Sequence, residues 1–255
     1  MKTPARSPHT QPVRHIRLRL PGVGRSCISY RPPQRVAGSK QPTPPWIVFS
    51  PGALTTPGDY RVLLGELTAA GAAVLTLDYR WPLLFAGDAA EARRAILAAR
   101  RLLRGQLPAR GLARHRLPPA PTGRRRAAAP LRILGYSLGG WVLSAGFGQG
   151  FGGRPVEWVL LGVSSLQEPW HKPATRRARV RLLAGSEDGV VNPAGLEGLA
   201  AALGSPVEWL PGVNHFGLLA ARVGAPEFRA RDRATRLDQR ASAARIARQI
   251  LGKAR

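Results

Sequence analysis

The sequence contains one cysteine, Cys27, which excludes a disulfide within the chain and a cysteine-based metal cluster. It has no stretch of about 18 consecutive apolar residues, the length that a membrane-spanning helix requires. Residues 1–20 contain no apolar segment followed by a small-residue cleavage site, so no secretory signal is expected there. These absences predict a soluble protein of the cytoplasm.

Acidic residues are also scarce. Only 14 Asp and Glu residues stand against 39 Lys and Arg residues, which gives a formal charge of +25. Such a charge favours either a polyanionic partner or a compositional drift toward Arg, Ala, Gly and Pro. The arginines are scattered over nearly every predicted element, which favours drift. We therefore expect no specific nucleic-acid partner, and only non-specific binding to polyanions.

The chain is long enough to bury a substantial core, with 255 residues of which 44% are hydrophobic. Residues 1–12 are rich in proline and arginine and are predicted to form a flexible tail. Residues 13–255 are predicted to form a single domain. Within it, the Pro- and Arg-rich stretch 106–130 is interpreted as a solvated surface loop.

Strand and helix patterns alternate from about residue 46 to the end of the chain. Apolar runs predict buried strands at 46–50, 72–79, 131–136, 156–163, 178–185 and 206–212. Helical spacing of apolar residues predicts helices at 59–71, 88–105, 137–150, 192–204 and 235–253. Before them, two alternating segments at 15–20 and 27–31 predict an antiparallel pair. This order predicts an α/β protein with a mostly parallel sheet and helices on both faces.

A candidate nucleophile, Ser137, directly follows the predicted strand 131–136, in the sequence LGYSLGG. The pattern Gly-x-Ser-x-Gly allows a sharp turn from strand to helix, because small neighbours leave room for a strained backbone. The serine hydroxyl on such a turn is held above the carboxyl edge of the sheet, where functional groups collect in parallel sheets. The alternative is that Ser137 lies in an ordinary glycine-rich connection and has no catalytic role.

A serine hydroxyl needs a base to take its proton, and histidine is the usual base at neutral pH. His215 follows the last predicted strand and is favoured over His171, which follows the strand 156–163. The imidazole in turn needs a carboxylate to orient it. Asp188, after the strand 178–185, is the preferred acid, and Glu187 is the alternative. Catalytic triads built on a Gly-x-Ser-x-Gly turn have the chain order Ser, Asp, His, and these three residues follow that order.

A tetrahedral intermediate needs two backbone N–H donors. One is expected from Leu138, the residue after the nucleophile. The other is expected from the loop after the strand 46–50, which reads SPGAL, with Ala53 as the donor. Gly52 permits an unusual backbone turn in this loop.

Four segments, FSPGA, LGYSLGG, AGSEDGVV and PGVNHFG, together resemble the α/β-hydrolase superfamily in order and spacing over about residues 15–253. Within it, the chain resembles the small lidless serine hydrolases of the dienelactone-hydrolase-like and general esterase type. The resemblance implies an α/β-hydrolase fold with about eight strands, a Ser-His-Asp triad, an acyl-enzyme intermediate and no cofactor. A dienelactone hydrolase proper would carry a cysteine as nucleophile, and this chain has Ser137.

The connection between the strands 156–163 and 178–185 is short, so no large cap domain and an open cleft are expected. Candidates for the rim of this cleft are Tyr136, Trp141, Trp170 and His171. The sequence thus predicts an esterase for small or exposed carboxylic esters. Thioester or amide hydrolysis and acyl transfer are open alternatives on the same triad, and a non-catalytic polyanion-binding protein with this fold is a further one.

Overall fold

The computed structural model describes residues 14–20, 24–33, 44–78, 131–144, 156–166, 178–219 and 226–252. Its strands are β1 Arg14–Leu20, β2 Gly24–Arg31, β3 Trp46–Ser50, β4 Ala73–Asp78, β5 Leu131–Tyr136, β6 Val156–Leu161, β7 Ala178–Gly185 and β8 Val207–Leu210. Its α-helices are α1 Arg61–Ala69, α4 Leu138–Ser144, α5 Pro193–Leu203, α6 Pro226–Arg231 and α7 Gln239–Leu251. Two short 3₁₀ helices, η2 Pro57–Tyr60 and η5 Phe216–Leu218, complete the described elements.

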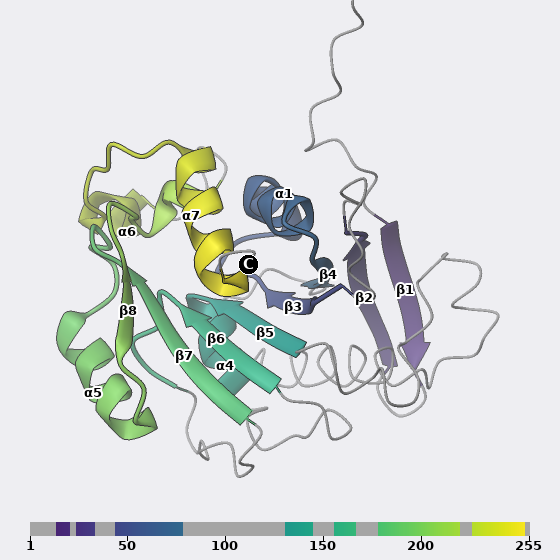
Figure 1. Ribbon diagram of the computed structural model, residues 1–255, viewed down its shortest axis with the longest axis horizontal. Helices are drawn as coiled ribbons and strands as arrows, with labels where there is room; N and C mark the ends of the chain where they lie inside the picture. The colour runs from purple at the N-terminus through teal and green to yellow at the C-terminus, as the bar shows by residue number, and fades with distance from the viewer. Residues whose placement is uncertain are drawn as a thin grey trace, which may run out of the picture.

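The strands described by the structure form one sheet of eight in the order β1-β2-β4-β3-β5-β6-β7-β8 (Figure 1). The six strands from β4 to β8 are all parallel, and β1 and β2 are antiparallel additions at one edge. The predicted α/β class and mostly parallel sheet are therefore confirmed. Because β3, β5, β7 and β8 point the same way, the loops that follow them meet at one edge of the sheet.

Helices cover both faces of the sheet. The helices α1 and α7 lie together over one face, where Leu63 and Leu67 of α1 and Ile246 of α7 pack against strand residues that include Phe49. The opposite face is covered by α4, beside β5, and by α5, whose Leu196 packs against Ala184 of β7. Successive strand residues alternate between the two faces, so each central strand is buried on both sides.

The core on the α1 and α7 side is the larger of the described apolar clusters. Where a strand contributes more than one residue to this core, the residues alternate along the strand and so point to the same face, as Leu134 and Tyr136 of β5 do. The apolar residues of α7 recur at helical spacing, so its buried stripe faces the sheet. Asp238 begins α7, because its carboxylate accepts a hydrogen bond from the Ala241 backbone N–H at 2.7 Å.

Charged side chains form a ladder on the same face, toward the amino ends of the strands. Arg132 of β5 bonds Glu157 of β6 at 2.7 Å, and Glu157 lies 3.6 Å from Arg181 of β7. Arg181 then binds Glu208 of β8 through two nitrogens, at 2.6 and 2.5 Å, and donates to the Gln249 carbonyl in the last turn of α7. A cation at a helix C-terminus is favourable, so the ladder holds α7 to the edge of the sheet away from the strand ends that carry Ser137 and His215.

The structure differs from the sequence prediction in a few element bounds. Helix α6 was not predicted, because PEFRAR is short and has no apolar spacing. The strand expected at 206–212 is limited to β8, since Pro211 and Gly212 form a turn. The predicted helix 88–105 and loop 106–130 lie outside the described residues. In the segments that the structure describes, no helix is both long enough and apolar enough to span a membrane.

Candidate active site

A strained turn follows β5 and carries Ser137. Its φ is +51°, in the left-handed region that residues other than glycine rarely adopt. The glycines around it leave the space that this turn needs. A β-carbon on Gly135 would lie 2.4 Å from the Gly140 α-carbon, and one on Gly139 would lie 2.1 Å from the Pro51 carbonyl oxygen. The Gly-x-Ser-x-Gly pattern thus folds into the sharp strand-to-helix turn that its small residues predicted.

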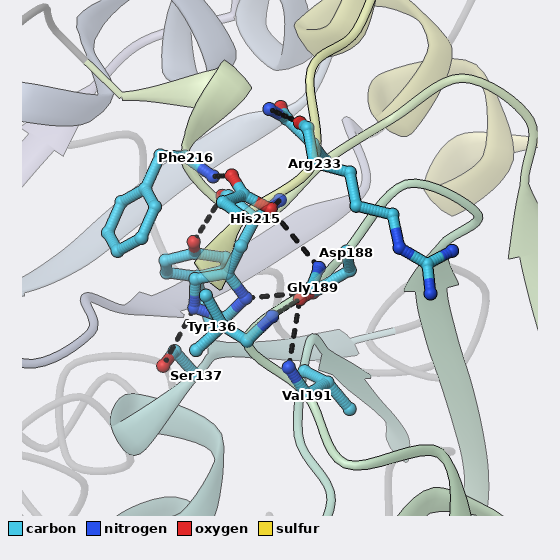
Figure 2. A network of polar contacts seen from close by, with 11 residues as sticks. Tyr136, Ser137, Asp188, Gly189, Val191, His215, Phe216 and Arg233 are labelled. Carbon is cyan, nitrogen blue, oxygen red and sulfur yellow. Dashed lines mark hydrogen bonds and ion pairs between the residues drawn. The ribbon is translucent and has the colours of Figure 1, made fainter. Parts of the chain in front are cut away.

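The histidine of the site is His215, at the start of η5 in the loop after β8. Its Nε2 lies 3.2 Å from Ser137 Oγ, within hydrogen-bond reach. Its Nδ1 lies 2.8 Å from Asp188 Oδ2, and both side chains are 96% shielded from solvent, with 4% exposed. Figure 2 shows Ser137, His215 and Asp188 joined in one chain of contacts. The structure therefore brings together the three residues that the sequence singled out from three separate loops.

The carboxylate of Asp188 uses its two oxygens differently. Oδ1 accepts hydrogen bonds from the backbone N–H groups of Val190 and Val191, both at 3.0 Å, while Oδ2 faces His215. The alternative acid, Glu187, instead accepts a hydrogen bond from the neighbouring Ser186 hydroxyl at 2.9 Å. Of the two adjacent acids, only Asp188 therefore contacts the imidazole.

The imidazole of His215 is enclosed on several sides. Gly162, after β6, lies beneath it with φ of +64°, and a β-carbon there would be 3.2 Å from His215 Cε1. The Tyr136 ring lies 5.0 Å from the imidazole, centroid to centroid, and the Phe216 ring lies 5.2 Å from it in a T-shaped arrangement. These neighbours restrict the orientations that the ring can take.

Tyr136 does not lie on the rim of the site, contrary to the sequence prediction. It is 2% exposed and belongs to the core under α1 and α7. Because strand residues alternate between faces, Tyr136 shares the core-facing side of β5 with Leu134. Its hydroxyl donates to the His215 backbone carbonyl at 2.5 Å. Burial raises the pKa of this hydroxyl well above its ordinary value, so it stays a donor.

The loop after β3 is held by a closed set of hydrogen bonds. Gly52 N–H donates to the Tyr60 hydroxyl at 2.9 Å, and the Thr55 hydroxyl donates to the Gly52 carbonyl at 2.7 Å. Tyr60 and Thr55 are themselves 2.9 Å apart, oxygen to oxygen. Burial raises the pKa of Tyr60, so its hydroxyl is protonated and donates to Thr55. The Gly52 N–H is therefore already hydrogen-bonded, and the next backbone N–H along the loop is that of Ala53.

The loop after β3 also contacts the nucleophile turn. Gly139, two residues after Ser137, lies so close to Ser50 and Pro51 that a β-carbon on it would overlap both carbonyl oxygens. The next residue but one after Pro51 is Ala53, and the residue before Gly139 is Leu138. The two expected oxyanion donors thus belong to segments that pack directly on each other. Leu54, which follows Ala53, has φ of +55°, so the backbone turns sharply here as well.

The remaining rim candidates have different outcomes. Trp141 is half-buried on α4, where it packs with Leu138 against Val142. Trp170 and His171 lie outside the described residues, so their place on the rim stays a prediction. Among the described residues, no three His, Cys, Asp or Glu side chains form a group that could hold a metal ion.

Sequence reasoning missed three residues that shape the site: Thr55, Tyr60 and Asp232. Thr55 and Tyr60 hold the loop after β3, as described above. Asp232, before α7, accepts hydrogen bonds from backbone N–H groups of both loops that carry Asp188 and His215. The one signal in the sequence is that Asp232 is an isolated acid in a run of arginines, RARDRATR.

No protein-family model and no curated protein sequence matches the chain. Several solved structures share its fold. A lidless α/β serine hydrolase from Xanthomonas campestris matches with a TM-score of 0.53 at 15% identity, over 81% of this chain and 87% of that one. A dienelactone hydrolase-like promiscuous phosphotriesterase from metagenomic libraries matches with a TM-score of 0.56 at 18% identity, over 94% and 95%. The thioesterase domain from the curacin biosynthetic pathway matches with a TM-score of 0.55 at 12% identity, over 94% and 100%.

At these identities the likeness concerns the fold. The matches cover most of both chains. The chain therefore has the α/β-hydrolase fold, as its motifs predicted.

Proposed function

We propose that the protein is a serine hydrolase that cleaves carboxylic esters. The observation that carries this proposal is the contact chain from Ser137 Oγ through the His215 imidazole to the Asp188 carboxylate, at 3.2 and 2.8 Å. The left-handed backbone of Ser137 supports it, because such strain persists where the surrounding structure fixes a functional group in place. A non-catalytic protein has no use for this combination.

Acylation begins with Ser137. Its Oγ attacks the ester carbonyl carbon while Nε2 of His215 takes the hydroxyl proton. Asp188 orients the imidazole through Nδ1 and stabilises the positive charge that the ring acquires. The carbonyl π electrons move onto the oxygen, and a tetrahedral intermediate forms. When it collapses, the bond to the alcohol oxygen breaks and His215 returns the proton to the departing alcohol.

Deacylation repeats the same proton movements with water. His215 removes a proton from a water molecule, and the resulting nucleophile attacks the acyl carbon on Ser137. The second intermediate collapses with the Ser137 oxygen as leaving group, and His215 gives that oxygen its proton back. The products are a carboxylic acid and the free enzyme.

The backbone N–H groups of Ala53 and Leu138 are the proposed donors to the negative oxygen of each intermediate. Their segments pack against each other through Gly139 and Pro51. Gly52 is the less suitable donor, because its N–H already binds the Tyr60 hydroxyl. Donors fixed in advance toward a developing charge lower the barrier, because they need no reorganisation during the reaction.

Small or exposed esters are the proposed substrates. The support is the short connection between β6 and β7, residues 162–177, which leaves little chain for a cap over the site. Thioesters are a second candidate substrate class, because a thioesterase domain is among the structural neighbours. The same triad would act on either acyl donor, with a thiol in place of the alcohol as leaving group.

Hydrolysis of p-nitrophenyl esters of increasing acyl length, beside the matching thioesters, tests the proposal. The wild type is expected to turn over the shorter esters, and Ser137→Ala is expected to lose turnover by several orders of magnitude. Ser205→Ala is the control, because the Ser205 hydroxyl donates to the Val180 carbonyl near the amino end of β7, away from the strand ends that carry the site. A serine-reactive phosphonate is expected to label Ser137, as located by mass spectrometry.

Two outcomes would contradict the proposal. Ester turnover that survives Ser137→Ala unchanged would exclude Ser137 as the nucleophile. Salt-sensitive binding of RNA without turnover of any ester or thioester would favour the non-catalytic polyanion-binding alternative instead.

A further inference from the structure

The two loops that carry Asp188 and His215 are joined to each other only over part of their length. The last ladder pair of β7 and β8 is Gly185 with Leu210, and two further backbone hydrogen bonds, from Ser186 to Leu210 and from Glu187 to Val213, continue it. In the described part of the chain, no backbone–backbone hydrogen bond joins the loops beyond Glu187. Asp188 and His215 lie just beyond this point.

Asp232 takes over where the backbone pairing stops. Its Oδ1 accepts the Gly189 N–H at 3.2 Å and the His215 N–H at 3.0 Å, and its Oδ2 accepts the Phe216 N–H at 2.8 Å. One half-buried carboxylate therefore holds both loops. Figure 2 shows Gly189 beside Asp188 and Phe216 beside His215, which places the bonded N–H groups next to the two functional side chains.

The chain around Asp232, residues 231–235, is here named the strap, and it makes further contacts with the same loops. The Arg233 N–H donates to the Glu187 carbonyl at 3.3 Å, and the Asn214 side chain donates to the Arg233 carbonyl at 2.8 Å. Gly189 lies against the strap so tightly that a β-carbon would be 1.9 Å from the Arg231 carbonyl oxygen. The Thr235 hydroxyl also bonds the Gly212 carbonyl. The strap thus lies across both loops.

We infer that Asp232 is a positioning residue of the site, which holds Asp188 and His215 at the spacing that proton transfer requires. This inference rests on the proposed function. A carboxylate suits the task because it can accept several N–H groups at once and has no hydrogen to oppose them. Displacement of catalytic groups by about 1 Å can cost about 100-fold in rate, so a clamp outside the reacting atoms can control kcat.

Three variants measure the role of Asp232. Asp232→Ala removes all three acceptor contacts, while Asp232→Asn keeps one oxygen and turns an NH₂ group toward a backbone N–H. Asp238→Ala is the matched control, because Asp238 is an exposed acid just after the strap whose carboxylate accepts the Ala241 N–H at the start of α7. Thermal unfolding of all three variants separates a general loss of stability from a local effect.

Two readouts follow the site itself. The first is the split between kcat and KM for ester hydrolysis. The second is the proton resonance of the His215 Nδ1–H in the free protein, which lies far downfield while this proton is held by the Asp188 carboxylate. The second readout needs no substrate, so it stays informative whether or not the protein hydrolyses esters.

We expect Asp232→Ala to lower kcat by about 10- to 100-fold with KM changed less than about twofold, and Asp232→Asn to fall between it and the wild type. The Nδ1–H resonance is expected to shift or vanish in Asp232→Ala and to persist in Asp238→Ala. Wild-type kcat in Asp232→Ala would overturn the inference while the proposed function stands. So would an equal loss of kcat in Asp238→Ala at an equal loss of stability. If the wild type hydrolyses no ester, the proposed function fails, and persistence of the resonance in Asp232→Ala overturns the inference separately.

Discussion

The residue before the candidate nucleophile holds the backbone of the candidate base: the Tyr136 hydroxyl donates to the His215 carbonyl oxygen at 2.5 Å. The two residues are 79 positions apart in the chain. The segments that carry Ser137 and His215 are thus joined twice, once by the contact of Ser137 Oγ with His215 Nε2 and once by the Tyr136 hydroxyl on the His215 backbone carbonyl. A change at Tyr136 therefore reaches His215 without altering any group of the proposed triad.

Tyr136→Phe is expected to weaken both stability and activity. The His215 carbonyl loses its partner in a buried position, which costs about 1–3 kcal/mol in the free energy of unfolding. Because the imidazole is then less firmly placed, kcat is expected to fall by about 10-fold with KM little changed. Chemical denaturation and ester kinetics measure the two effects, and an unchanged kcat would show that the bond is only structural.

Substitutions of Ser137 are expected to separate activity from stability. Ser137→Gly and Ser137→Ala both remove the hydroxyl, so both are expected to be inactive. Only glycine adopts φ of +51° without strain. The free energy of unfolding of Ser137→Gly is therefore expected to exceed that of Ser137→Ala by about 1 kcal/mol. Thermal unfolding of the two variants measures the difference. Equal stabilities would contradict the strained geometry at Ser137.

Tyr60→Phe is expected to loosen the loop that carries Ala53. It removes the acceptor of the Gly52 N–H and the donor to Thr55, which costs about 1–3 kcal/mol in unfolding free energy. A displaced oxyanion donor lowers kcat more than it changes KM, because the donor acts on charge that develops in the transition state. Thr68→Val is the control, since it removes another buried hydroxyl, bonded to the Gly65 carbonyl of α1. It is expected to lower stability and leave kcat unchanged.

The ion pair between Arg181 and Glu208 predicts a pH dependence of stability. The hydrogen bonds from Arg181 lower the pKa of Glu208 below the ordinary glutamate value of 4.5. A lowered pKa in the folded state means that the ionised carboxylate stabilises the fold above pH 4.5, and that this contribution is lost as the pH falls through the lowered value. The unfolding temperature of the wild type is therefore expected to exceed that of Glu208→Gln at pH 7 and to approach it in acid. Glu197→Gln, on the exposed side of α5, is the control. If the difference in unfolding temperature between the wild type and Glu208→Gln does not shrink in acid, the ionised Glu208 carboxylate is not its cause.

Most of the fold could be predicted because its central strands are continuous apolar runs. The strands 46–50, 131–136 and 178–185 have the predicted bounds, since a strand buried on both faces has a clear beginning and end in the sequence. The short helix α6 could not be predicted, because its charged residues lie on the surface and leave no apolar periodicity.

The site was predictable where a side chain occupies a fixed place relative to a strand. Ser137, Asp188 and His215 each follow a parallel strand, and the topology brings the ends of those strands together. Asp232 was not predictable, because its partners are backbone N–H groups, which every residue except proline carries. Tyr136 was placed on the wrong surface, although the alternation of β5 assigns it to the same face as Leu134.

Strand β6 contributes no reacting group to the proposed site, yet the residue that follows it lies against the imidazole of His215. Gly162 offers the ring of His215 a surface of bare backbone, and Tyr136 and Phe216 stand at its flanks. In the proposed reaction, a ring confined in this way is expected to keep its place while it carries the proton taken from Ser137. The same nitrogen is then expected to stay close to the leaving oxygen that must receive this proton, so the close packing of the ring on the Gly162 backbone would serve both halves of the proposed reaction.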